Sequence, residues 1–195
     1  MKILQNTTTW IVAALILLMA ATRYNHFGSS LVLPDASYAV FFLGGLYLGR
    51  TRGGWAILAL LLVEAALVDY YAINFQGVSG WCVTSAYGFL MLAYAVLWSV
   101  GRWYAPRHNL TGKNLLGLFA SAVAAGSLAF VIANVSFYLL AGYFGSMGVA
   151  EFAARVAQYF GSYIEVAIMY IGCAVIVQMG YAILTGKVEH NTKAV

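Results

Sequence analysis

Charged residues are scarce in this chain: Asp, Glu, Lys and Arg make up 8% of its 195 residues, whereas soluble globular domains carry about 25%. Hydrophobic residues make up 63%, and the mean hydropathy is +0.85. A soluble fold of this size exposes too much of its surface to hide so many apolar side chains. Disordered chains are polar and poor in aromatic residues, so disorder is excluded as well. The composition therefore predicts an integral membrane protein.

Long charge-free runs identify the kind of membrane fold. Residues 3–22, 70–101 and 114–150 contain no charged side chain. A spanning helix needs about 20 mainly apolar residues, whereas barrel strands alternate apolar and polar residues over about 10. We therefore expect a single all-α integral membrane domain over 1–195, and a short surface helix within 142–158. The six expected transmembrane helices lie near 8–22, 36–50, 54–73, 82–100, 114–141 and 159–185.

The distribution of Lys and Arg predicts the orientation of these spans. Only Arg23 and Arg155 fall on one side. The other side holds Lys2, Arg50, Arg52, Arg102, Arg107, Lys113, Lys187 and Lys193. Cytoplasmic loops carry the excess of positive charge, so both termini are expected in the cytoplasm. This asymmetry accounts for the net charge of +4 without a nucleic-acid partner.

The connection between the third and fourth spans brings together an acid, a thiol and a phenol. Asp69 and Cys82 lie at equal distances from its midpoint near residues 75–76. In an antiparallel helix pair such residues lie at similar depth, so we expect both side chains to face one outer pocket. Tyr87 follows five residues after Cys82, or about 140° around a helix. It shares that pocket only if Cys82 lies on the irregular end of the connection.

These residues also have plain structural interpretations. Free cysteines are usually buried small hydrophobes, and Asp69 is a candidate ion-pair partner for Arg23 or Arg155. Cys173 falls in the middle of the sixth span, so we expect it to pack in the core and to form no disulfide with Cys82.

Other polar features exclude some chemistries and leave others open. Glu64 and Glu165 have no basic partner in their spans, which leaves protonation, mutual pairing or a cavity wall as alternatives. The segment 77–80 matches the Gly-x-Ser-Gly of rhomboid-type intramembrane proteases, but a nucleophilic serine needs a nearby base. Histidines occur only at 26, 108 and 190, outside the expected spans. Their absence from the spans argues against a protease and against a membrane haem protein.

The external connections are rich in aromatic residues, which favours a broad, flat, partly apolar ligand. Tyr71 and Trp81 belong to this group, in the same hairpin as Cys82. Arg155 and His26 lie on the same expected side and are candidates for contacts with amide or phosphate groups.

The span pattern, the internal termini and the external site resemble the substrate-binding S-components of energy-coupling-factor vitamin transporters. Asp69, Cys82 and Tyr87, with the segment Gly-Val-Ser-Gly-Trp-Cys, resemble the BtuM family of solitary cobalamin proteins from Gram-negative bacteria. The likeness in size and spans covers the whole chain, and its specific part is the hairpin 69–87. Components that dock on the shared energising module carry Ala-x-x-x-Ala in the first helix. Here Leu17 and Leu18 follow Ala13 and Ala14 at that spacing, so no energy-coupling module is expected.

The resemblance implies a multi-pass transporter for cobalamin (vitamin B12) in the bacterial inner membrane, with Cys82 as the axial ligand of the cobalt. A thiolate suits a polarisable metal and would labilise the group on the opposite face. Reductive decyanation of cyanocobalamin is therefore implied alongside transport, with Asp69 and Tyr87 as helpers. Two other functions stay open: a membrane redox enzyme that uses an external thiol, and a scaffold subunit in which Cys82 is inert.

Overall fold

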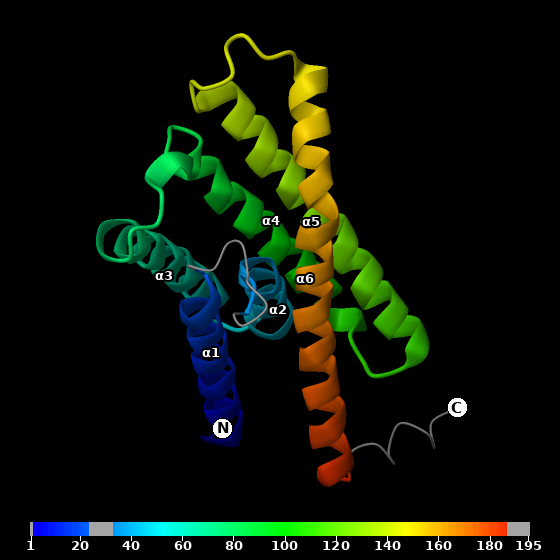
Figure 1. Cartoon of the computed structure of the whole chain (residues 1–195). Coiled ribbons are helices and arrows are strands. Elements are labelled where there is room, and N and C mark those ends of the chain that lie inside the picture. The colour runs from blue at the N-terminus through cyan, green and yellow to red at the C-terminus, as the bar shows by residue number, and fades with distance from the viewer. Residues whose placement is uncertain (1, 24–32, 187–195) are drawn as a thin grey trace.

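The computed structural model describes residues 2–23 and 33–186, and within these ranges it is all-helical. Figure 1 shows the arrangement of the helices. They are α1 (Lys2–Thr22), α2 (Ser37–Leu48), α3 (Gly54–Phe75), α4 (Tyr87–Tyr104), α5 (Gly112–Leu140) and α6 (Val149–Leu184), with 3-10 turns at Gly80–Cys82 and Ala105–Arg107. The prediction of an all-α fold is confirmed.

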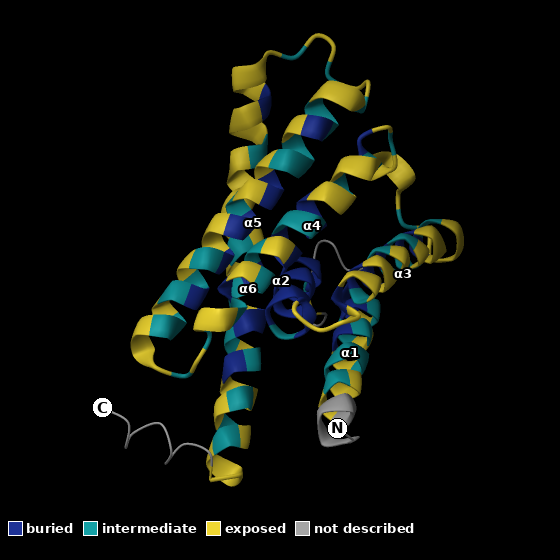
Figure 2. Cartoon of the chain, turned by 180° about the vertical axis from the view of Figure 1, so that it is seen from behind, coloured by how far each residue is buried: buried dark blue, intermediate teal, exposed yellow. Residues whose placement is uncertain are grey.

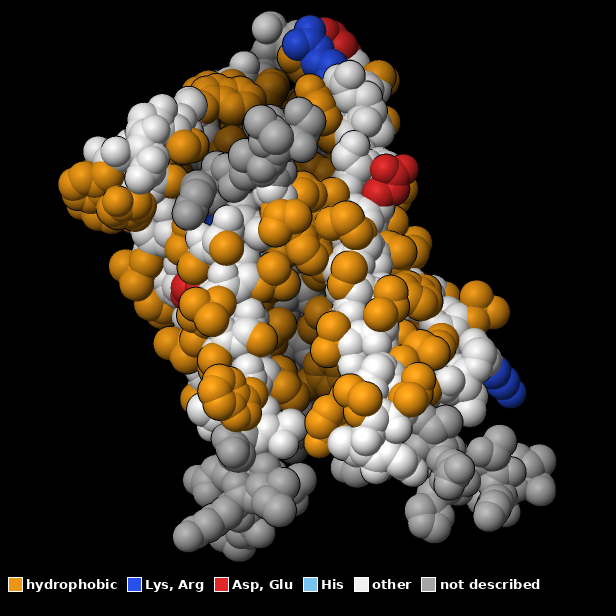
Figure 3. All heavy atoms as spheres, turned by 60° about the horizontal axis from the view of Figure 1, so that its bottom comes forward, with side chains coloured by type: hydrophobic (Ala, Val, Ile, Leu, Met, Phe, Trp, Pro, Cys, Tyr) orange, Lys and Arg blue, Asp and Glu red, His pale blue; other side chains and the backbone are white. Residues whose placement is uncertain are grey.

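Three of the helices, α3, α5 and α6, are long and apolar enough to cross a membrane. The apolar parts of α1 and α2 are shorter. Large hydrophobic side chains lie exposed along the longer helices, and Figure 3 shows hydrophobic side chains spread over one face of the molecule with few charged side chains among them. Such a surface suits a lipid environment better than water.

The short helix α2 is the centre of the molecule (Figure 2). All of its residues except Tyr47 are buried. Its backbone touches that of α4, because a Cβ atom on Gly45 would lie 2.0 Å from the carbonyl oxygen of Trp98. A Cβ atom on Gly101 would likewise lie 2.1 Å from the carbonyl oxygen of Phe42. Gly45 is thus a packing residue, because small residues let two helix backbones approach closely.

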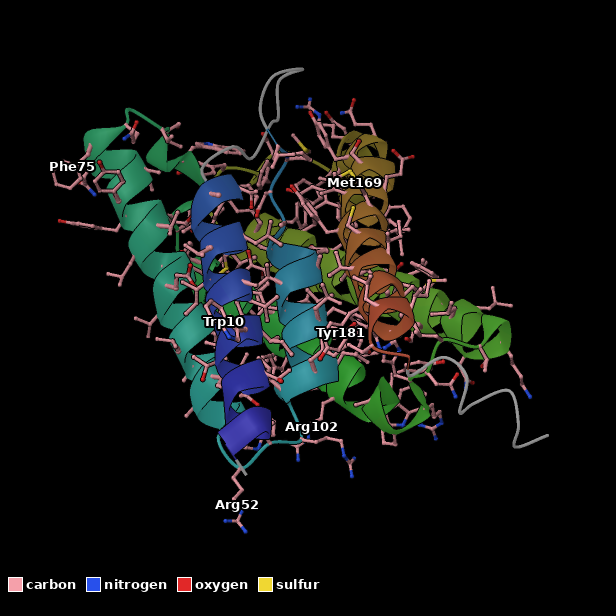
Figure 4. The ribbon with its side chains drawn as sticks, turned by 90° about the horizontal axis from the view of Figure 1, so that it is seen from below. Trp10, Arg52, Phe75, Arg102, Met169 and Tyr181 are labelled. Carbon is pink, nitrogen blue, oxygen red and sulfur yellow. The ribbon has the colours of Figure 1, made fainter. Side chains whose placement is uncertain are left out.

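The two ends of the bundle differ in character. The start of α1 and the end of α6 lie at one end, and the α3–α4 and α5–α6 hairpins lie at the other (Figure 1). Arg52 and Arg102 lie at the first end, opposite Phe75 (Figure 4). We call these the basic end and the hairpin end. Buried residues of α2 and α4 lie in the core between these two ends.

Three predicted helix starts, those of α6, α4 and α1, differ from the structure. The short surface helix expected within 142–158 does not form, because α6 starts at Val149 and runs unbroken to Leu184. Gly148 is extended just before it, and Glu151 pairs with Arg155 one turn later, which stabilises the new first turns. The fourth helix starts at Tyr87 rather than at 82. The first helix begins already at Lys2, while α2, α3 and α5 agree with expectation to within two residues.

Candidate functional site

Arg23 directly follows α1 and is fully buried. Its guanidinium group donates hydrogen bonds to α2, α3 and α4. The acceptors are Asp69 Oδ1 (2.8 Å), Asp69 Oδ2 (2.7 Å), Ser37 Oγ (2.8 Å), the Tyr94 hydroxyl (2.7 Å) and the Ala65 carbonyl (3.1 Å). A buried guanidinium is tolerable only when its donors are satisfied and its charge is paired. This one side chain therefore connects α1, α2, α3 and α4.

Asp69 holds the other half of this network. It forms a two-pronged ion pair with Arg23 and also accepts a hydrogen bond of 2.6 Å from the Tyr87 hydroxyl. Of the two cations expected as its partner, Arg23 is the one the structure selects. Arg155 instead pairs with Glu151 at 2.8 Å on the surface of α6. Asp69 and Tyr87 are thus neighbours, as predicted. The same carboxylate forms a buried ion pair with Arg23.

The segment just before α2 also takes part in this network through Asp35 and Ser37. Asp35 Oδ1 accepts hydrogen bonds from the Ser37 amide (2.9 Å) and hydroxyl (2.6 Å), so it lies at the start of α2. The Tyr170 hydroxyl of α6 donates to the Pro34 carbonyl (2.8 Å). The Ser37 hydroxyl therefore links the Asp35 carboxylate to Arg23 in one chain of hydrogen bonds.

Cys82 lies on the 3-10 turn that precedes α4, and it is exposed. Its position outside the helix meets the condition for sharing a pocket with Tyr87. The interpretation as a buried small hydrophobe is wrong, because the thiol is open to the surface. Partial desolvation within the hairpin, and then the charge of Asp69, raise the pKa of the Cys82 thiol above its ordinary value.

Trp81 joins the two hairpins at this end of the molecule. Its ring stacks on Tyr143 with centroids 5.2 Å apart and packs edge-on against Phe137 at 4.9 Å. The Tyr143 hydroxyl also donates to the Trp81 carbonyl at 3.4 Å. The turn that carries Cys82 is therefore held between α3–α4 on one side and α5–α6 on the other.

The remaining predicted site residues are not gathered around Cys82 by any contact in the described residues. Tyr71 is exposed and stacks on Phe75 at 5.3 Å, and Arg155 is exposed at the tip of α6. His26 lies outside the described residues. The prediction that Cys173 packs in the core is wrong. Cys173 is exposed on α6, because that helix turns much of its surface outward.

The described residues contain no group of three or more His, Cys, Asp or Glu side chains able to hold a bare metal ion. An exposed thiol can bind a metal as a thiolate. No protein-family model matches the chain, and no curated protein sequence matches it.

The sequence analysis singled out Asp69 and Tyr87 and named Arg23 as a candidate partner of Asp69, but it missed Ser37 and Tyr94 as members of the same network. Arg23 gave a signal because it is a lone cation directly after an apolar helix. Ser37 and Tyr94 gave no such signal, since their contribution depends on how α2 and α4 pack.

Proposed function

We propose that this chain is an inner-membrane cobalamin transporter, an S-component-like bundle of six transmembrane helices with both termini in the cytoplasm. The hairpin end then faces the periplasm and binds the corrinoid, with Cys82 as the axial ligand of the cobalt. The observation that carries the proposal is the exposed, free thiol of Cys82 on the turn between α3 and α4. Hydrogen bonds of Asp69 with Arg23 and Tyr87 join these two helices.

The chemistry of a corrinoid fits this arrangement. The corrin ring supplies four equatorial nitrogens to its cobalt, so one protein donor completes an axial position. Cys82 provides a soft sulfur donor for a polarisable metal. The stacked rings of Trp81 and Tyr143 next to it offer an apolar surface of the kind a flat macrocycle packs against.

Decyanation follows from ligation on the opposite face of the ring. The Cys82 thiolate binds the cobalt trans to cyanide, and one electron from an added low-molecular-weight thiol reduces Co(III) to Co(II). Cyanide then leaves with its bonding electron pair. Two turnovers consume two thiols, which form one disulfide and release two protons. The primary function proposed is transport, and decyanation accompanies binding.

The proposal is tested by uptake of radiolabelled cobalamin into cells that depend on it, with this chain as their sole inner-membrane carrier. Wild type and Cys173→Ala are expected to restore uptake without an energy-coupling module, whereas Cys82→Ala is expected to lose most of it. Uptake that is equal in both cysteine variants would contradict the role of Cys82. An absence of uptake, with corrinoid-free redox turnover by the wild type, would favour the thiol enzyme, and an absence of both would favour a scaffold.

A further inference from the structure

Glu64 is an acidic residue in the middle of the apolar helix α3. Both of its carboxyl oxygens are buried, and neither has a hydrogen-bond partner among the described residues. It does not pair with Glu165, which is exposed on α6, a helix that shares no substantial interface with α3. Two of the alternatives from the sequence remain, namely a protonated carboxyl and a cavity wall.

Glu64 lines a hollow of about 370 Å³ between α1 and α3. The rest of its wall consists of Ala20, Leu60, Val63, Leu67, Val68 and Tyr71. Leu60, Val63 and Leu67 are themselves largely exposed, on a helix apolar enough to span a membrane. The hollow therefore lies on the apolar outer surface of α3, and Glu64 is the only one of its lining residues with a carboxyl group.

Among the described residues, no cation forms a salt bridge or a hydrogen bond with this carboxyl group. Arg23 donates to the carbonyl of Ala65, the next residue along, but its charge is paired with Asp69. Arg23, Asp69, Tyr87 and Tyr94 are all joined within the buried network. Among the titratable side chains of α1 to α4, Tyr71 alone shares the wall of the hollow with Glu64. A carboxylate without a partner in an apolar medium is costly, and such a group takes up a proton instead.

We propose that Glu64 is a membrane-embedded proton-binding site, which keeps its proton at neutral pH and opens to the bilayer through the α1–α3 hollow. The ligand is a proton, and the accompanying modification is by a hydrophobic carbodiimide. The protonated carboxyl group adds across an N=C bond of dicyclohexylcarbodiimide: the proton goes to nitrogen and the carboxyl oxygen to carbon. Acyl migration to nitrogen then gives a stable N-acylurea. Nothing leaves, so the protein gains the mass of one carbodiimide.

The test is mass spectrometry of the full-length protein in lipid vesicles after treatment with dicyclohexylcarbodiimide at pH 7. Glu64 and Glu165 fall on different tryptic fragments, 53–102 and 156–187. We expect one adduct on Glu64, located by fragmentation, which is absent from Glu64→Gln and retained in the matched variant Glu165→Gln. A water-soluble carbodiimide is expected to leave Glu64 unmodified, because the hollow opens to lipid.

Infrared spectroscopy gives a second measurement that does not depend on reagent entry. The difference spectrum of wild type minus Glu64→Gln at pH 7 is expected to contain the carbonyl stretch of a protonated carboxyl group. A carboxylate stretch in its place would overturn the proposal. Labelling of Glu64 by the water-soluble reagent as readily as by the hydrophobic one would overturn its opening to the bilayer.

Discussion

At the scale of single residues, the buried ion pair of Arg23 and Asp69 joins the helices at the hairpin end of the molecule. Loss of one partner from a buried pair leaves an uncompensated charge, and this costs more than the pair itself contributes. The hydroxyl of Tyr87 adds a charge-assisted hydrogen bond to the same carboxylate. The loss of stability on removing the Asp69 charge can therefore be compared with the loss on removing the Tyr87 hydroxyl.

Asp69→Asn is expected to destabilise the protein by about 3–5 kcal/mol, since it strands the Arg23 charge. Tyr87→Phe removes one hydrogen bond to a charged group and is expected to cost about 1.5–3 kcal/mol. Thermal unfolding in detergent measures both. The control is Glu151→Gln, which breaks the exposed pair with Arg155 and is expected to cost about 0–1 kcal/mol. An Asp69→Asn protein as stable as this control would contradict the assignment.

Alkylation of Cys82 without any corrinoid tests the electrostatics of the turn. Because the pKa of the thiol is raised, the thiolate fraction at pH 7 is smaller than for an ordinary cysteine. The rate of reaction with a maleimide is therefore expected to be slow at pH 7 and to rise with pH beyond the ordinary thiol pKa. The measurement uses Cys173→Ala, so that Cys82 is the sole cysteine, with a short unstructured cysteine peptide as reference. A rate that levels off at lower pH than that of the peptide would show that the pKa is depressed.

At the scale of elements, the close contact of α2 with α4 organises the bundle. The two backbones meet where glycines remove the Cβ atoms, and this contact places Ser37 and Tyr94 within reach of Arg23. Because α2 is only 12 residues long, or about 18 Å at 1.5 Å per residue, it is shorter than a hydrocarbon core of about 30 Å, and the proposed second span also includes the residues next to it. Its stability must come from enclosure by the longer helices.

Gly101→Ala is expected to destabilise the protein strongly, because its new Cβ atom would lie 2.1 Å from the backbone oxygen of Phe42. Overpacking typically costs about 1–3 kcal/mol, and a clash with backbone belongs at the upper end. Gly88→Ala on the same helix is the matched control, since no atom lies within 4 Å of the added Cβ. Melting temperatures of the two variants compare them, and equal values would contradict the close contact.

The sequence predicted some helices and site residues well and others poorly, and the reason is physical. Apolar runs located α2, α3 and α5 to within two residues, since burial in lipid or protein requires such runs. The start of α6 was missed because the segment 142–158, which contains Arg155, was interpreted as a short surface helix. The ion pair at i,i+4 spacing instead extends the helix beyond its apolar part. Similarly, Asp69 and Tyr87 were predictable as neighbours, whereas Tyr94 depends on helix packing that no local pattern encodes.

At the scale of the whole molecule, the basic end and the hairpin end define the proposed orientation. Fusion of a fluorescent protein to the C-terminus is expected to give fluorescence in the cytoplasm, and fusion of alkaline phosphatase there is expected to be inactive. Alkaline phosphatase inserted after Gly145, in the α5–α6 loop, is expected to be active. The reverse pattern would place Cys82 on the cytoplasmic side and contradict uptake from the periplasm.

The most direct test of the central claim is the visible absorption spectrum of purified protein incubated with cyanocobalamin. Wild type and Cys173→Ala are expected to hold the pigment with absorption bands shifted from those of the free vitamin, because the Cys82 sulfur ligates the cobalt. Cys82→Ala is expected to lose this shift and to bind more weakly. A protein that stays colourless, or a shift that survives unchanged in Cys82→Ala, would contradict cobalt–thiolate ligation at the hairpin end.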